Sequence, residues 1–325
     1  MGAKMSILND TKDEVIEKIK RDRADITFLS EINTNMTSVH KVMIESKVYI
    51  LKFVMIYTPN EYDQTQNDYD LQRYQIMLSC GKTSVFPLIR ESFLITVKAH
   101  RFGVIIEQLI EYSFSDGAKL IYASCGNEPI RTTVLFMQKL IDLYLSAKSE
   151  NIIAHRDLAF ENIMFDSNLK LYFIDSGSVK SSVITTTEFS QIAPTRLFYA
   201  APEYSLDHPS DKAEVKEIYT IGLISMSFLE TAMNNSFDNY PKCGIVQWIN
   251  KNRYAGIIQL NIQFNPRFKS LFENHLLIDY FIGDSDNLLY RLLASMTLQS
   301  ASSRIRDYRI VKNVLNKIET EINHE

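Results

Sequence analysis

The pattern of apolar and polar positions changes along the chain and predicts two regions of different structure. Up to about residue 110, apolar residues come in short β-prone runs separated by polar links. These runs predict strands over residues 26–32, 39–45, 47–54, 86–97 and 102–110. The first three are close together and predict an antiparallel meander. A polar stretch from Pro59 onward continues as a helix through Leu71, Tyr74 and Met77.

The spacing becomes helical from Arg131 onward. Val134, Met137, Ile141 and Leu145 recur at helical intervals, and this helix is expected to end before Asn151. Almost every stretch after Ala201 has a helical pattern. The most apolar segment, 218–229, is too short to span a bilayer, so it predicts a helix buried in the core. Near the N-terminus, Thr11 is expected to cap a further amphipathic helix.

Five strands and one helix, followed by a longer helical half, predict an α+β fold with two lobes. The expected organisation is an N-terminal helical extension over 1–23, a small β-rich lobe over 24–110 and a larger helical lobe over 111–325.

Charge and cysteine content narrow the classes of protein that fit. The 325-residue chain has a formal net charge of −4 and no basic run, which argues against nucleic acid or an anionic membrane as its main partner. Cys80, Cys125 and Cys243 are odd in number and far apart, which favours reduced thiols in a cytoplasmic protein. Neither cysteine nor histidine occurs at the spacing of a zinc site. We expect no transmembrane segment.

Carboxylate and amide side chains stand at the ends of two apolar runs in the second half. The stretch His155-Arg156-Asp157-Leu158-Ala159-Phe160-Glu161-Asn162 places an aspartate and an asparagine five residues apart, between a helix and a strand. Leu171-Tyr172-Phe173-Ile174-Asp175-Ser176-Gly177 follows, and Ala201-Pro202-Glu203 comes later. Phosphoryl transfer needs oxygen ligands for a metal ion and a residue that orients the attacking hydroxyl.

In order and spacing, these three stretches resemble the HRD loop, the DFG motif and the APE motif of the protein-kinase family. The resemblance implies that Asp157 accepts or orients the substrate hydroxyl. It also implies that Asn162 and Asp175 hold Mg²⁺ or Mn²⁺, and that ATP is the phosphoryl donor. An isolated aspartate usually caps a turn, so the resemblance depends on the three stretches occurring together in this order.

The run Val48-Tyr49-Ile50-Leu51-Lys52-Phe53 resembles the family's VAIK strand, which implies that Lys52 contacts the α- and β-phosphates. The family pairs this lysine with a glutamate from the following helix. Asp70 is the best-placed carboxylate here, with Met77 on the same helical face, and Glu61 is the alternative.

Two further parts of the nucleotide site follow from the same resemblance. The backbone from Glu107 to Leu109 would bind adenine, as in the family's hinge. The glycine-rich loop is missing, because Ile32, Thr34 and Thr37 stand where its glycines belong. Thr34 and Thr37 hydroxyls are expected to take part in covering the phosphates.

Several other positions depart from the family pattern. Ser176 replaces the DFG phenylalanine, and Glu217, at the start of the apolar helix, stands where the family has aspartate. Arg304 is the expected partner of Glu203. The hydroxyl-rich segment from Ser178 to Ser190 offers candidate sites of autophosphorylation.

The leading hypothesis is an ATP-dependent protein kinase that phosphorylates serine or threonine rather than tyrosine. Retained chemistry without the glycine loop resembles kinases of viruses or of bacterial effectors, which are delivered into a host cell. One alternative is a pseudokinase that serves as a scaffold, favoured by the missing glycines and Ser176. Another is a small-molecule kinase, against which Ala201-Pro202-Glu203 counts.

Overall fold

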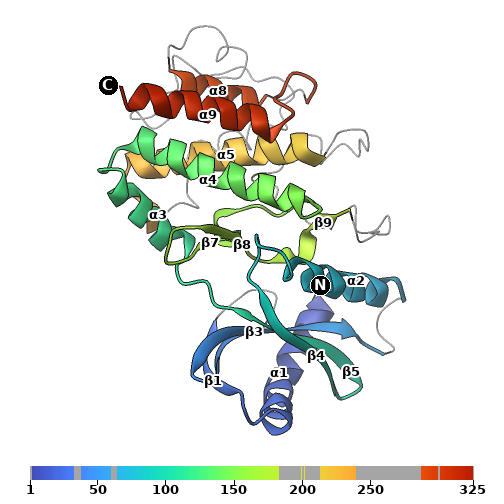
Figure 1. The fold of residues 1–325 in the computed structure, drawn as a ribbon. Helices are drawn as coiled ribbons and strands as arrows, with labels where there is room; N and C mark the ends of the chain where they lie inside the picture. Colours follow the sequence, from blue (N-terminus) through green and yellow to red (C-terminus); the bar gives the residue numbers. More distant parts are fainter. Residues whose placement is uncertain are drawn as a thin grey trace. The chain divides into compact units, whose positions relative to one another are not determined.

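The computed structural model describes residues 2–32, 38–59, 64–182, 199, 201, 213–238, 287–298 and 301–324. They form a mixed α+β structure, which confirms the predicted class (Figure 1). The described chain divides into two compact units. The first contains residues up to Ile110 and the short segment 174–178, and the second contains 111–173, 179–182 and the residues that follow.

The first unit is built on a five-stranded antiparallel sheet with the order β1-β2-β3-β5-β4. Its strands are β1 (Thr27–Ile32), β2 (Ser38–Ile44), β3 (Lys47–Tyr57), β4 (Ile89–Val97) and β5 (His100–Gln108). The pairing of β1 with β2 and of β2 with β3 confirms the predicted meander. β5 lies between β3 and β4, so it is a central strand with a partner on each side.

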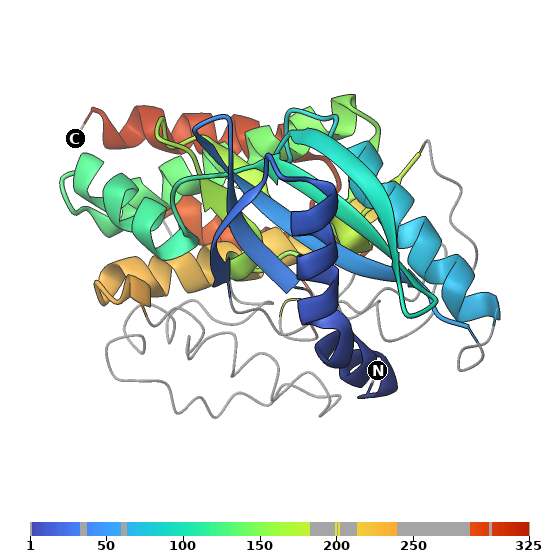
Figure 2. The ribbon, with the colours of Figure 1, turned by 90° about the horizontal axis from the view of Figure 1, so that it is seen from below.

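Helix α1 (Gly2–Asp22) lies across one face of this sheet (Figure 2). Val15 and Ile19 are fully buried in a cluster with sheet residues such as Phe53 and Val104. Just after the helix, Arg23 donates hydrogen bonds to Glu91 of β4 at 2.8 and 2.9 Å. The helix is therefore an integral layer of the first unit.

The predicted start of α1 was wrong, because Thr11 lies inside the helix and is 3% exposed. The residues between Gly2 and Thr11 contain neither proline nor a further glycine, so nothing in the sequence stops the helix from beginning earlier.

Helix α2 (Gln64–Cys80) packs against the opposite face of the sheet. Successive residues of a strand point to opposite faces, so Val54 and Ile56 contact α2 while Phe53 faces α1. Tyr74 of α2 lies so close to Gly103 of β5 that a Cβ added there would be 2.3 Å from a ring carbon.

Several strand boundaries differ from the predictions, and the strand expected over 47–54 continues to Tyr57. The strand expected from Phe86 begins at Ile89, because Pro87 has no N–H for the ladder and interrupts the run. The strand expected to reach Ile110 ends at Gln108.

The second unit is largely helical. Its helices are α3 (Phe114–Ser124), α4 (Pro129–Ser149), α5 (Ala213–Met233), α8 (Leu288–Met296) and α9 (Tyr308–Ile322). Its short strands are β6 (Ile152–Ala154), β7 (Ile163–Phe165), β8 (Leu171–Phe173) and β9 (Lys180–Ser181), with the 3₁₀ turn η1 (Phe160–Asn162) before β7. β6 pairs with β9 and β7 pairs with β8, both antiparallel. The 3₁₀ turn η2 (Ser176–Ser178) belongs to the first unit.

Helix α5 forms the core of the second unit. All its residues from Glu217 to Leu229 are buried, which confirms the predicted buried helix. Phe228 of α5 stacks on Phe136 of α4 with ring centroids 4.2 Å apart, and Phe114 lies 4.3 Å from Phe160. α4 begins with proline at its first turn and ends just before Asn151, close to the predicted boundaries.

Candidate active site

Asp157 lies in the loop between β6 and η1, and Asn162 is the last residue of η1; both belong to the second unit. The Nδ2 amide of Asn162 donates to the backbone carbonyl of Asp157 at 2.6 Å and to its carboxylate Oδ2 at 3.1 Å. Asn162 is 5% exposed. The two residues that sequence reasoning paired are therefore in contact, and the asparagine fixes the backbone and the carboxylate of Asp157 together.

Glu217 anchors this loop to the core helix α5. Its Oε1 accepts the backbone N–H of Arg156 at 3.0 Å, and its Oε2 accepts the hydroxyl of Tyr144 at 2.5 Å. The carboxyl group is completely buried, and this burial raises its pKa above the usual value, although the hydrogen bonds from Tyr144 and the loop backbone act in the opposite direction. The sequence indicated the position of Glu217 but not these contacts.

Arg156 has a left-handed backbone, with φ of 66°. Such a φ is uncommon for an arginine and is maintained only where surrounding contacts require it. The hydrogen bond from its N–H to Glu217 is one such contact. Its neighbour His155 is buried and packs on Phe173 with ring centroids 5.0 Å apart. The loop is thus held on its inner side by core residues.

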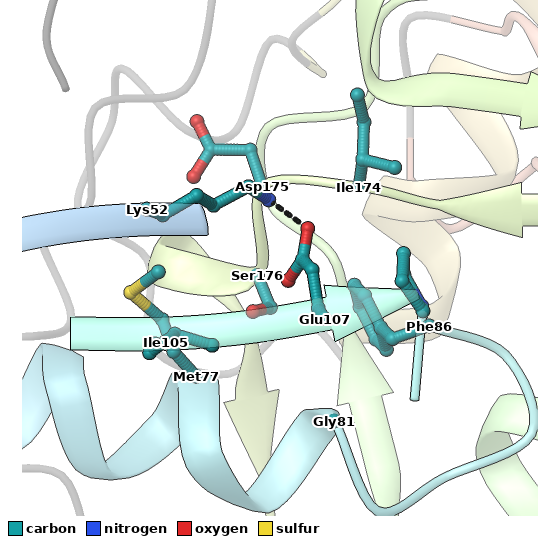
Figure 3. A pocket seen from close by; sticks show the side chains of 10 residues that line it. Lys52, Met77, Gly81, Phe86, Ile105, Glu107, Ile174, Asp175 and Ser176 are labelled. Carbon is teal, nitrogen blue, oxygen red and sulfur yellow. Dashed lines mark ion pairs between the residues drawn. The ribbon is translucent and has the colours of Figure 1, made fainter. Parts of the chain in front are cut away.

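Lys52 of β3 forms an ion pair with Glu107 of β5 in the first unit (Figure 3). The side chains of the two residues are 16% and 11% exposed, respectively. Sequence reasoning assigned Glu107 a role through its backbone, whereas here its side chain contacts Lys52. Its backbone lies inside the sheet, opposite Ile50 of β3 and Ile89 of β4.

Leu109 follows the end of β5 and is half-buried. Within the described chain its backbone N–H and C=O form no hydrogen bond with other protein groups.

The C-terminal end of helix α2 lies at the same position along the sheet as Lys52. Met77 packs with Ile105, which lies directly opposite Lys52 on β5. At the other end of the helix, the Asn67 side chain hydrogen-bonds to the backbone N–H and C=O of Thr58, at 3.2 and 3.4 Å. The helix therefore runs along β3 with its N-terminal half displaced away from Lys52.

Asp70 lies in that N-terminal half. It is 8% exposed, on the same buried face as Met77, as predicted. The two are seven positions apart, which corresponds to about 10 Å of helix rise. Asp70 accordingly forms no ion pair with Lys52 in the described structure, where the carboxylate beside Lys52 is that of Glu107.

Asp175 lies beside this pair, in the segment 174–178 of the first unit. Its backbone is left-handed, with φ of 55°, a conformation that aspartate tolerates better than most residues. Its side chain is 51% exposed, and Arg73 of α2 approaches its carboxylate at 3.6 Å. In the same segment, the Ser176 side chain lies close to the thiol of Cys80. Asp175 thus offers an accessible carboxylate beside Arg73, and it lines the same pocket as Lys52.

These residues line one small pocket. Its walls are formed by Lys52, Met77, Gly81, Phe86, Pro87, Ile105, Glu107, Ile174, Asp175 and Ser176 (Figure 3). The space that water can occupy inside it is about 10 Å³, enough for roughly one water molecule and far too small for a purine. The side chains themselves are of suitable types, because an ammonium group suits phosphate and an exposed carboxylate suits Mg²⁺.

Other predicted residues lie outside the described part of the chain: Thr34, Thr37, Glu61, Pro202 and Glu203. Arg304 is described, and it donates to the backbone carbonyls of Leu298 and Val215 while its guanidinium lies over the ring of Tyr219. Its predicted pairing with Glu203 stays a prediction.

The two residues predicted to hold the metal ion belong to different units: Asn162 belongs to the second unit and Asp175 to the first. Among the described residues, no group of three or more histidine, cysteine, aspartate or glutamate side chains is arranged to hold a metal ion.

None of the helices that the structure describes has the combination of length and apolar character needed to cross a bilayer.

Comparisons with known proteins point to protein kinases, at a distance. No family model matches the chain. A probable LRR receptor-like serine/threonine-protein kinase of Arabidopsis thaliana is 27% identical over 133 residues, which are 39% of this chain and 14% of that protein. Cysteine-rich receptor-like protein kinases 1 and 2 of the same plant are 31% and 27% identical, over 29% and 42% of this chain. The matched stretches span only 14–21% of these three relatives. The chain therefore has a distant and partial similarity to receptor-like serine/threonine kinases.

Proposed function

We propose that this chain is a protein kinase that transfers the γ-phosphoryl group of ATP to a serine or threonine hydroxyl of a protein. The observation that carries the proposal is the loop in which Asn162 binds Asp157 and Glu217 holds the backbone from the core. Such a loop presents one carboxylate in a fixed orientation, as a residue that orients a hydroxyl and takes up its proton must be presented.

In this proposal the first unit binds the nucleotide. Lys52 contacts the α- and β-phosphates, the backbone groups of Leu109 contact adenine, and Thr34 and Thr37 help to cover the phosphates. A divalent cation, Mg²⁺ or Mn²⁺, neutralises phosphate charge, and we assign Asp175 and Asn162 as the residues that hold it.

The architecture and the relatives support this assignment. A five-stranded antiparallel sheet with α2, followed by a helical unit built on α5, is compatible with a bilobal protein-kinase-like fold. One of the three relatives reported, the LRR receptor-like kinase, is a serine/threonine-protein kinase by name, which favours a serine or threonine acceptor over tyrosine. The identity of the protein substrate and of any activating partner is left open by the proposal.

The experiment is a transfer assay with labelled ATP and either Mg²⁺ or Mn²⁺. Wild type is compared with Asp157→Ala and with the matched control Asp142→Ala, which removes an exposed aspartate of α4 that pairs with Lys312. Loss of a residue that moves a proton lowers a rate by roughly 10²- to 10⁴-fold. We expect that loss for Asp157→Ala and none for Asp142→Ala. Mapping of the labelled residues then identifies the acceptor.

If wild type transfers no more phosphate than Asp157→Ala with either metal, the kinase proposal is wrong. The second candidate is then a pseudokinase scaffold. One observation favours it: Lys52 is already paired with Glu107, and the pocket around them has room for about one water molecule. A chain that binds a partner but shows no ATP-dependent transfer is the outcome that this second candidate predicts.

A further inference from the structure

The proposed nucleotide-binding lysine has its carboxylate partner on a neighbouring strand. We infer that Glu107 of β5 is the positioning residue for Lys52, in place of a carboxylate from α2. The inference rests on the proposed nucleotide-binding role of Lys52, and it adds the side chain of Glu107 to that site.

The register of the sheet dictates this pairing. Lys52 lies opposite Ile105, and Ile50 lies opposite Glu107, so Lys52 and Glu107 are diagonal neighbours on paired strands. Because side chains alternate between the faces of a strand, residues two positions apart point to the same side. Diagonal neighbours are about 7–8 Å apart at their backbones, a gap that a lysine and a glutamate together can bridge.

The surroundings make the ion pair costly to break. Both side chains are more than four-fifths buried, and Met77, Phe86 and Ile105 line the same pocket. A largely buried charge that loses its partner is unfavourable, because it has been removed from bulk water without the interaction that compensated for this. No second carboxylate pairs with Lys52 in the described structure, so its ammonium group is held where Glu107 directs it.

The ion pair leaves Lys52 able to bind phosphate. An ammonium group has three donors, so one can remain on Glu107 while the others contact phosphate oxygens. Lys52 and Glu107 belong to adjacent strands in continuous register, and the pair is therefore held by the sheet itself. A shift of α2 would move Asp70 and Met77 but would leave this pair intact.

The test is a double-mutant cycle on the affinity for ATP in the presence of Mg²⁺, measured by calorimetry on the full chain. Glu107→Gln keeps the shape of the side chain and removes its charge. The matched control is Glu91→Gln, which neutralises another sheet glutamate in an ion pair, that with Arg23. Asp70→Asn tests the carboxylate of α2.

We expect Glu107→Gln to weaken ATP binding by roughly 10- to 100-fold, the usual effect of losing a charge-assisted hydrogen bond. Glu91→Gln and Asp70→Asn should each leave the affinity within about twofold of wild type. In a Lys52→Met background, Glu107→Gln should cause no further loss, because the residue acts through Lys52. A purely structural role would give the same loss in both backgrounds.

The inference is overturned if Glu107→Gln binds ATP as tightly as wild type or more tightly, if its effect persists without Lys52, or if Asp70→Asn reproduces it. Transfer measured on the same variants separates this outcome from failure of the proposed function. A wild type that binds ATP without transferring phosphate refutes the kinase proposal, while the binding cycle still decides on Glu107. A wild type that binds no ATP overturns both.

Discussion

Replacement of Glu217 by alanine should destabilise the second unit by about 3–5 kcal/mol. The change removes the acceptor of the Arg156 N–H and of the Tyr144 hydroxyl, both of which are buried. Each buried donor left without an acceptor costs about 1–3 kcal/mol, and the lost side-chain volume leaves a cavity in the core. A loss of this size is a large part of the 5–15 kcal/mol that ordinarily stabilises a protein.

Glu217→Gln is the matched control, because it retains the shape of the side chain. Its carbonyl oxygen can accept the Arg156 N–H, and its amide can donate to the Tyr144 oxygen, since a phenol both donates and accepts. We expect Glu217→Gln to cost less than about 1 kcal/mol at neutral pH, because it also avoids burial of a negative charge.

The difference between wild type and Glu217→Gln should depend on pH. Burial raises the pKa of the Glu217 carboxyl in the folded state above the value of 4.5 that it has in the unfolded chain. The folded state therefore holds its proton to a higher pH than the unfolded state does. Wild type should lose stability relative to Glu217→Gln as the pH rises above 4.5, until the folded carboxyl has also ionised.

Two measurements check this reasoning. Chemical denaturation followed by circular dichroism, from about pH 4 to about pH 7, gives the free energies of unfolding. Hydrogen exchange reports on the Arg156 amide, which should lose protection in Glu217→Ala and keep it in Glu217→Gln. If Glu217→Ala costs less than about 1 kcal/mol and the amide stays protected, Glu217 does not anchor the loop.

Three other predictions concern the first unit. Gly103→Ala places a Cβ 2.3 Å from the buried Tyr74 ring, so denaturation should show a loss of about 1–3 kcal/mol, and a loss below about 0.5 kcal/mol contradicts the packing described. Burial lowers the pKa of His40 below 6.5, so the unfolded chain takes up this proton first. Stability should fall as the pH drops below 6.5, and His40→Phe should remove that part of the slope; an unchanged slope assigns it to other groups. Burial also raises the pKa of the Cys80 thiol to about 12, so a thiol reagent at neutral pH should label it only after denaturant is added, and rapid labelling of the native protein would show the site to be open.

Much of the fold could be predicted from the sequence, because the hydrophobic period of a strand differs clearly from that of a helix. Alternating runs predicted the strands, and the continuous apolar segment at the start of α5 predicted its burial. The element boundaries were less reliable. β4 begins after Pro87 and not at Phe86, and α1 begins well before Thr11. At neither place does the sequence contain a strong signal for the first residue of the element.

The contacts of the candidate site were predicted only where they are local. Asp157 and Asn162 are five residues apart, so one loop brings them together. Lys52 and Glu107 are far apart in sequence, and their contact requires β5 to be inserted beside β3, which local pattern does not specify. A signal was present, because each charge interrupts an apolar strand run. Pairing those two interruptions across adjacent strands would have identified the contact.

The position of α1 has a consequence for how the protein acquires its structure during synthesis. Val15 and Ile19 leave the ribosome first, yet they pack against residues of β5 such as Val104 and Ile106. Roughly 85 residues must be added in between, which takes about 4–17 s at ordinary rates of translation. During that time the apolar stripe of the helix can be covered only by the strands that precede β5, such as β3 with Phe53. The sheet of the first unit can be completed only when β5 has emerged, so a ribosome stalled before residue 100 should carry a first unit that is not fully folded.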